Sequence, residues 1–110
     1  AAASGVSLHI EAGRLPLLPE TRELAALGMI PAGAYRNQEH YRVFLRSRQP
    51  EDALDELFGF DPQTSGGLLF ALSPRAAEAM IAGLQSLAYS LPIARIGTVG
   101  DGPAGTIFFS

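Results

Sequence analysis

Residues 61–67, with the sequence DPQTSGG, combine hydroxyl groups and unhindered backbone amides in one short segment. Thr64 and Ser65 offer hydroxyls, and Gly66 and Gly67 offer N–H groups that no Cβ atom obstructs. Successive N–H groups of this kind can form a nest that stabilises phosphoryl oxygens. The two glycines also permit positive φ and a close approach of the backbone to a ligand. On turn chemistry alone, an ordinary tight turn is the competing interpretation.

Asp61 and Pro62 open this segment and together predict a turn. Proline fixes φ, and the Asp61 carboxylate can accept N–H groups from the residues two and three positions further on. We therefore expect Asp61 to organise the loop, and the alternative is a contact with metal or substrate. The segment is not a P-loop, because the GxxxxGK[ST] pattern and its lysine are absent.

A second polar pair, Arg36 and Asn37, ends a segment that begins at Gly33. A guanidinium group can donate two parallel hydrogen bonds to a phosphate or a carboxylate. Arg36 could therefore face an active-site cleft, or it could brace the loop at residues 61–67 from within the domain. Both roles fit the residue type, and bracing is slightly favoured.

No residue is expected to act as a catalytic group or as a metal ligand. The chain has no Cys, and His9 and His40 lie in separate segments, so a zinc site is improbable. The four acidic residues within positions 51–56 predict the solvated face of a short helix rather than a pair of catalytic carboxylates.

Length, charge and hydropathy limit the classes of protein to which this chain can belong. A chain of 110 residues is expected to form one domain, here spanning residues 1–110. Charged residues make up 17%, and this low share fits either a face that another domain covers or a small domain rich in Ala and Gly. The net charge of −3 and the scattered arginines exclude the basic footprint of a nucleic-acid-binding protein. No apolar run is long enough to span a membrane and no signal peptide is evident, so we expect a cytoplasmic protein.

The segments before the loop give mixed signals. Alternation predicts a strand at residues 6–10, and a helix is predicted at 19–27 with Gly28 as its end. Residues 29–40 lack periodicity and predict a loop of functional length, and residues 41–46 have some strand character. Residues 1–4 read as the last turn of a helix that Gly5 ends.

The segments around and after the loop are easier to assign. A short helix at 50–58 ends at Gly59 and leads into the loop, and the apolar residues 68–72 form the clearest strand prediction. Ser73 and Pro74 start a helix that continues to about Leu87. Two closing strands are predicted as a hairpin, at residues 92–99 and 106–109. The fold class is therefore α+β, with a mixed sheet of about four strands and two or three helices.

The string DPQTSGGLL closely resembles the signature of the C-terminal domain of selenophosphate synthetase (selenide, water dikinase), a family of the aminoimidazole ribonucleotide synthetase superfamily. Further segments look like successive landmarks of that domain: GVSLHI at 5–10, LPLLP at 15–19, GAYRN at 33–37 and ARIGTV at 94–99. The resemblance therefore extends over nearly the whole chain. It implies the three-layer C-terminal domain of the superfamily, with partial likeness to a ferredoxin-like fold.

The resemblance implies an activity that needs more than this sequence. The family uses ATP, magnesium and selenide to make selenophosphate, AMP and phosphate. Its reactive Cys or selenocysteine, its Lys and its magnesium-binding aspartates belong to an N-terminal domain that this sequence lacks. We therefore expect the chain to form one wall of the active-site cleft, to be inactive alone and not to bind ATP or magnesium tightly. The expected partner is that N-terminal domain, through which the full-length family largely forms homodimers.

The resemblance also assigns residues and leaves alternatives. Arg36 and Asn37 look like the Arg-Asn pair of the family, and with the loop they give the expected phosphate- or substrate-binding set: Asp61, Thr64, Ser65, Gly66, Gly67, Arg36 and Asn37. One alternative is a stand-alone binding or interaction module. Another is the C-terminal domain of a different ATP-dependent member of the superfamily, such as a thiamine-monophosphate kinase or a hydrogenase-maturation protein, although these should lack the Pro-Gln-Thr between the Asp and the Ser-Gly-Gly.

Overall fold

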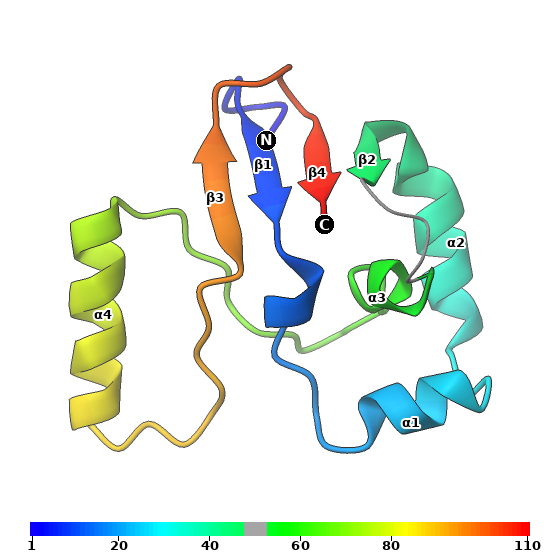
Figure 1. Ribbon diagram of the computed structural model, residues 1–110, viewed down its shortest axis with the longest axis horizontal. Helices are drawn as coiled ribbons and strands as arrows, with labels where there is room; N and C mark the ends of the chain where they lie inside the picture. Colours follow the sequence, from blue (N-terminus) through cyan, green and yellow to red (C-terminus); the bar gives the residue numbers. More distant parts are fainter. Residues whose placement is uncertain (48–52) are drawn as a thin grey trace.

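A mixed four-stranded sheet forms the centre of the computed structural model, which describes residues 1–47 and 53–110 (Figure 1). The strands, in the spatial order β2-β4-β1-β3, are β1 (Ser7–Ile10), β2 (Leu45–Ser47), β3 (Gly97–Gly100) and β4 (Ile107–Phe109). Strand β1 pairs antiparallel with β3 and parallel with β4, and β4 pairs parallel with β2. The predicted α+β class with a mixed sheet is therefore confirmed.

Four α-helices accompany the sheet within the described residues. They are α1 (Thr21–Ala26), α2 (Ala32–Tyr41), α3 (Ala53–Phe58) and α4 (Pro74–Ser86), with 3₁₀ turns η1 (Ala12–Arg14) and η2 (Arg42–Phe44). The first three gather near the β2 edge, whereas α4 stands apart beyond β3 (Figure 1). No helix of the described ranges combines the length and the apolar character that crossing a membrane requires.

The buried core is small and gathers around α3, which contacts η1, α1 and α2. Its apolar members among the described residues are Ala12, Ala25, Ala34, Leu57 and Phe109. The Phe109 ring of β4 lies so close to Gly59 that a Cβ atom there would be 3.3 Å from it. An ion pair links α1 to α3, because the Arg22 guanidinium lies 2.6 Å from Asp55 Oδ1. The Phe109 contact places the end of α3 against β4, the middle one of the three parallel strands, and the ion pair ties α1 to α3.

Two glycines end helical turns as predicted. Gly28 has φ +84°; its N–H bonds the carbonyl of Ala25, and the N–H of Met29 bonds the carbonyl of Leu24. This is the paired pattern by which a left-handed residue closes a helix and satisfies its last carbonyls. Gly5, with φ +67°, closes the first turn of the chain through the same pattern of bonds.

The loop predicted at residues 29–40 is wrong, because most of it forms helix α2. Pro31 stands just before the helix, where its missing N–H costs nothing. Glycine and asparagine favour turns, but Gly33 and Asn37 are positions where α2 contacts other segments. The strand predicted at 41–46 is also mostly wrong, because only Leu45 and Arg46 of that range belong to β2.

The predicted strand at residues 68–72 is not formed, and its residues are exposed. An apolar run becomes a strand only where a neighbouring strand accepts its backbone hydrogen bonds, and the described part of the chain supplies none here. The predicted hairpin is wrong as well, because β1 lies between β3 and β4. The connection crosses the end of β1, where Gly105 N–H bonds the Val6 carbonyl.

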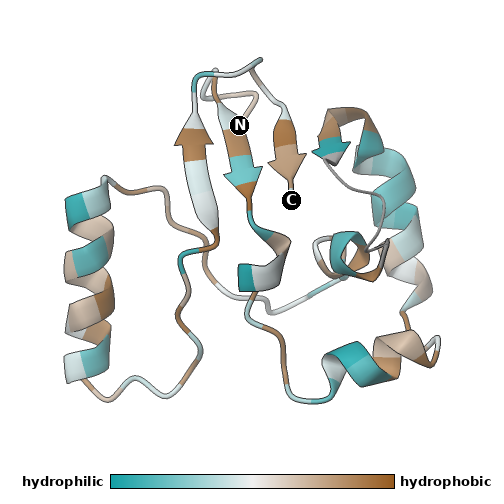
Figure 2. Ribbon diagram, in the orientation of Figure 1, coloured by the Kyte–Doolittle hydropathy of each residue, from teal (hydrophilic) through white to brown (hydrophobic). Residues whose placement is uncertain are grey.

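The predicted helices at 19–27, 50–58 and 75–87 correspond to α1, α3 and α4, although residues 50–52 lie outside the described residues. Ser73 caps α4, since its Oγ accepts the Ala76 N–H at 3.4 Å, and Pro74 occupies the first helical turn. Hydrophobic and hydrophilic residues alternate along α4 (Figure 2). Despite this amphipathic pattern, none of its residues is buried.

Candidate functional site

Helix α3 delivers the chain to residues 61–67, which we call the signature loop. The helix ends in a series of turns in which Phe60 N–H bonds the Leu57 carbonyl at 3.0 Å and Asp61 N–H bonds the Phe58 carbonyl at 3.4 Å. Because Gly59, directly after α3, lies against the Phe109 ring of β4, the start of the signature loop is placed close to the sheet.

Helix α2 also contacts the start of the signature loop. Asn37 Nδ2 donates a hydrogen bond of 2.9 Å to the Phe60 carbonyl. A Cβ atom on Gly33 would lie 2.8 Å from Pro62 Cγ, so the proline ring packs directly on the helix backbone. Gly33 and Asn37 are four residues apart and therefore share a face of α2. Sequence reasoning missed this contact, and the i, i+4 spacing of the two residues was the available signal.

A side-chain bond links α2 to α3. Gln38 Nε2 donates to Glu56 Oε1 at 2.8 Å, in a partly buried position. Gln38 follows Asn37 directly, so one turn of α2 contacts both α3 and the residue before the signature loop. Sequence analysis did not single out this glutamine.

The signature loop folds around the side chain of Gln63. Its Nε2 donates to Asp61 Oδ2 at 3.1 Å, and its Oε1 lies 2.5 Å from the position that a Cβ on Gly66 would take. Asp61 therefore organises the loop through a side-chain amide, whereas backbone N–H groups were expected as its partners. Gly66 leaves the room that the glutamine side chain occupies.

The rest of the signature loop points its polar groups to solvent. Thr64, Ser65, Gly66 and Gly67 are all exposed, and their backbone N–H groups bond no carbonyl of the described residues. A Cβ on Gly67 would meet nothing within 4 Å. Neither glycine has positive φ, so the loop does not use the left-handed conformation that glycine permits. Gly67 leaves open space beside the available N–H donors, whereas the space that Gly66 leaves is taken by the Gln63 side chain.

The structure separates the two members of the Arg36–Asn37 pair. Asn37 reaches the entry to the signature loop, whereas Arg36 is exposed and makes no hydrogen bond or ion pair with any described residue. The two histidines contact aromatic rings: His9 stacks on Phe108 at 4.6 Å, and His40 meets Tyr41 edge to face.

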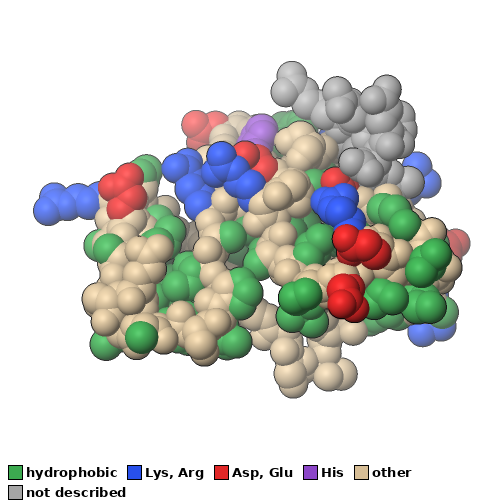
Figure 3. Space-filling model, turned by 60° about the horizontal axis from the view of Figure 1, so that its bottom comes forward, with side chains coloured by type: hydrophobic (Ala, Val, Ile, Leu, Met, Phe, Trp, Pro, Cys, Tyr) green, Lys and Arg blue, Asp and Glu red, His purple; other side chains and the backbone are tan. Residues whose placement is uncertain are grey.

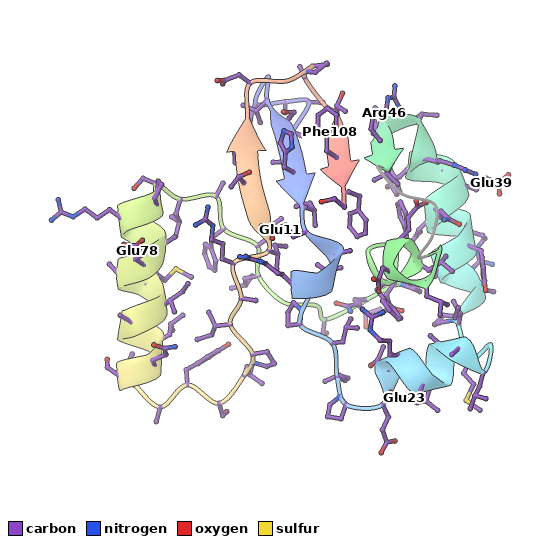
Figure 4. The ribbon with its side chains drawn as sticks, in the orientation of Figure 1. Glu11, Glu23, Glu39, Arg46, Glu78 and Phe108 are labelled. Atoms are coloured by element: carbon purple, nitrogen blue, oxygen red, sulfur yellow. The ribbon has the colours of Figure 1, made fainter. Side chains whose placement is uncertain are left out.

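Carboxylates do not gather in the described part of the chain. No group of three or more His, Cys, Asp or Glu side chains there could hold a metal ion. Glu11, Glu23, Glu39 and Glu78 lie on four separate segments, as Figure 4 shows, and Glu11 pairs with Arg14 at 2.7 Å. The donors of the signature loop suit an anion.

Three similar proteins found by comparison with known sequences carry the same name. A selenide, water dikinase of Caldanaerobacter subterraneus subsp. tengcongensis is 43% identical over 75 residues, covering 68% of this chain and 22% of that protein. One from Pelobacter propionicus is 42% identical over 88 residues, covering 76% of the chain and 24% of the relative. One from Geobacter metallireducens is 43% identical over 79 residues, covering 71% and 22%. No protein-family model matches the chain.

The chain is an α+β unit that spans less than a quarter of the length of these relatives. It therefore corresponds to a part of a larger enzyme. That enzyme family is selenide, water dikinase. The resemblance to the C-terminal domain of selenophosphate synthetase is thereby confirmed.

Proposed function

We propose that the chain is the C-terminal domain of a selenophosphate synthetase and that its signature loop forms one wall of the active-site cleft. The whole enzyme uses ATP and magnesium to convert selenide to selenophosphate in the cytoplasm, and residues 1–110 act in it as one domain. The observation that carries the proposal is the signature loop itself, whose entry is held by Asn37 and Gly33 while its N–H and hydroxyl groups stay open to solvent.

The chemistry of the signature loop suits phosphoryl oxygens. Phosphoryl transfer places negative charge on these oxygens, and fixed N–H donors stabilise it without reorganising during the reaction. The N–H groups of residues 64–67 and the hydroxyls of Thr64 and Ser65 supply such donors. Arg36, exposed on the helix that holds the loop, adds a cationic group able to donate two parallel bonds.

In this proposal the ligands for magnesium lie outside the chain. Since the described residues hold no carboxylate cluster, the part of the enzyme outside this chain supplies the ligands for magnesium. The isolated chain is therefore inactive and binds magnesium and ATP weakly. Calorimetry of the isolated chain with both present checks this, and binding in the micromolar range would contradict it.

Gly67→Val in the full-length enzyme tests the role of the signature loop. A Cβ at Gly67 meets nothing in this domain, so the substitution should spare folding while its branched side chain fills the space beside the N–H donors. Selenophosphate formation should fall by about 100-fold or more, the usual effect of losing such a donor. Gly13→Val is the matched control, because a Cβ at Gly13 also meets nothing within 4 Å. Full activity of the Gly67→Val variant would show that the signature loop does not take part in the active site.

A further inference from the structure

The signature loop is anchored at its start, and Gln63 is the first residue beyond the anchor. Asn37 of α2 donates a hydrogen bond of 2.9 Å to the Phe60 carbonyl, and the Pro62 ring lies against the backbone of the same helix. The backbone N–H groups and carbonyls of residues 63–67 bond no backbone group of the described chain. Within that part of the chain, side-chain contacts are therefore what holds the segment that carries the N–H donors.

Gln63 supplies such contacts with both ends of its side-chain amide. Its Nε2 donates to Asp61 Oδ2 at 3.1 Å. Its Oε1, Cβ and Cδ are the three atoms nearest to the position that a Cβ on Gly66 would take, at 2.5, 3.4 and 3.6 Å. The glutamine side chain therefore lies against the backbone at Gly66 and connects the anchored start of the signature loop with its glycine end.

The bond between Asp61 and Gln63 needs an oxygen acceptor rather than a negative charge. Figure 3 shows acidic side chains at several separate places on one face of the molecule, some of them beside basic ones, and Arg22 approaches Asp55 at 2.6 Å. Asp61 instead accepts a hydrogen bond from a neutral amide. An amide oxygen in place of the carboxylate could accept the same bond.

We propose that Gln63 is a positioning residue of the signature loop: its amide, held by Asp61 and lying against Gly66, keeps the N–H groups of residues 64–67 in the arrangement that the transferred phosphoryl group requires. The inference rests on the proposed function and adds a residue that acts through the loop rather than on the substrate. Donors stabilise developing charge best when they are in place before the reaction. A misplacement of about 1 Å can lower a rate about 100-fold.

Gln63→Ala in the full-length enzyme tests the positioning role. The kcat for selenophosphate formation should fall at least about tenfold while the KM for ATP changes less than about threefold, because the arrangement of the donors affects the transition state more than the bound substrate. Gln85→Ala is the matched control and should keep its kcat, since Gln85 is exposed on α4. An unchanged kcat in Gln63→Ala beside a lowered kcat in Gly67→Val would overturn the proposal.

A double-mutant cycle separates positioning from a general loss of stability. Gly66→Ala places a methyl group where Gln63 Oε1 lies, and the backbone at Gly66 does not have positive φ, so alanine can adopt it. The methyl group should displace the glutamine and lower kcat as Gln63→Ala does. The double variant should then lose no more than about threefold beyond either single variant. Losses that simply multiply would show that the two residues act independently and would count against the proposal.

Asp61→Asn and Asp61→Ala test the acceptor of the amide bond. Asparagine keeps an oxygen acceptor, so the kcat of Asp61→Asn should exceed that of Asp61→Ala by at least about fivefold. If Asp61 contacts magnesium instead, both variants should lose activity equally and should need more magnesium for the half-maximal rate. That result would refute the role assigned to the bond between Asp61 and Gln63.

Relaxation of the glycine amides gives a readout that does not depend on activity. In full-length protein with isotopically labelled glycine, the Gly66 and Gly67 amides should have order parameters of about 0.85, falling below about 0.6 in Gln63→Ala. Amides that stay rigid in this variant would contradict the proposal. Amides that loosen while Gln63→Ala and Gly67→Val both keep full activity would refute the proposed function and leave Gln63 with a structural role alone.

Discussion

Asn37 of α2 donates a hydrogen bond of 2.9 Å to the backbone carbonyl of Phe60, although 23 residues separate the two along the chain. Phe60 is the last residue before the signature loop. The bond therefore fixes the point at which the loop leaves α3, and it does so from a helix that also places Gly33 against Pro62. The geometry of the loop depends on α2 as much as on the loop's own sequence.

Asn37→Ala should lower the free energy of unfolding by about 1 kcal/mol, because it leaves a partly buried carbonyl without its donor. Urea unfolding of the isolated chain measures the loss. Arg36→Ala is the control on the same helix turn: Arg36 is exposed, so its removal should change stability by less than about 0.5 kcal/mol. Equal losses in the two variants would mean that the Asn37 bond contributes nothing specific.

Gly33→Ala and Gly83→Ala should change stability in opposite directions. Alanine improves an exposed helix interior by about 0.5–1 kcal/mol relative to glycine. At Gly83 of α4 a Cβ meets nothing within 4 Å, so this gain should appear in full. At Gly33 the same atom would lie 2.8 Å from the Pro62 ring, and overpacking of this kind costs about 1–3 kcal/mol. Thermal melts of the two variants compare their stabilities. A gain in stability for Gly33→Ala would show that the Pro62 ring moves aside without cost.

Local sequence predicted the features that depend on local chemistry. Gly28 was predicted to end α1 and Ser73 to start α4, and both do so through bonds within a few residues. Helix α2 was missed because Gly33 and Asn37 are turn-forming residues by local preference. Their partners, Pro62 and Phe60, lie more than twenty residues away, and such tertiary contacts override propensity.

Local sequence also failed to predict how the strands of the sheet pair. Residues 68–72 have the composition of a strand, but a strand also needs a neighbour, and no local pattern specifies one. The predicted hairpin failed for a related reason, since residues 100–105 look like a tight connection while β1 inserts between the strands they join. The site residues were chosen from the signature and from the Arg36–Asn37 pair, and the sequence could not show that Asn37 approaches the loop while Arg36 stays exposed.

Ala88→Gly should stabilise the chain. Ala88 ends α4 with φ +52°, and its N–H bonds the Gln85 carbonyl in the position that glycine usually occupies. The left-handed conformation costs a residue with a Cβ about 1 kcal/mol, which glycine avoids. Ala82→Gly, inside the same helix, should instead destabilise by about 0.5–1 kcal/mol. If both variants lose stability, the end of α4 is not closed by a left-handed residue in solution.

Ser7→Ala should destabilise the sheet at the point where the chain crosses from β3 to β4. Ser7 is fully buried, and its Oγ accepts the Gly102 N–H at 3.0 Å across 95 residues of sequence. Removing the oxygen leaves a partly buried N–H without an acceptor, which costs about 1–2 kcal/mol.

Chemical unfolding of this variant should be compared with that of Ser86→Ala, which removes an exposed hydroxyl bonded to Gly83 within α4 and should change stability by less than about 0.5 kcal/mol. Because the Ser7 bond holds the connection over the end of β1, Ser7→Ala should also speed hydrogen exchange at Gly102 and Gly105. A stability loss no larger than that of Ser86→Ala, with unchanged exchange at Gly102, would show that the connection between β3 and β4 is held in place without this bond.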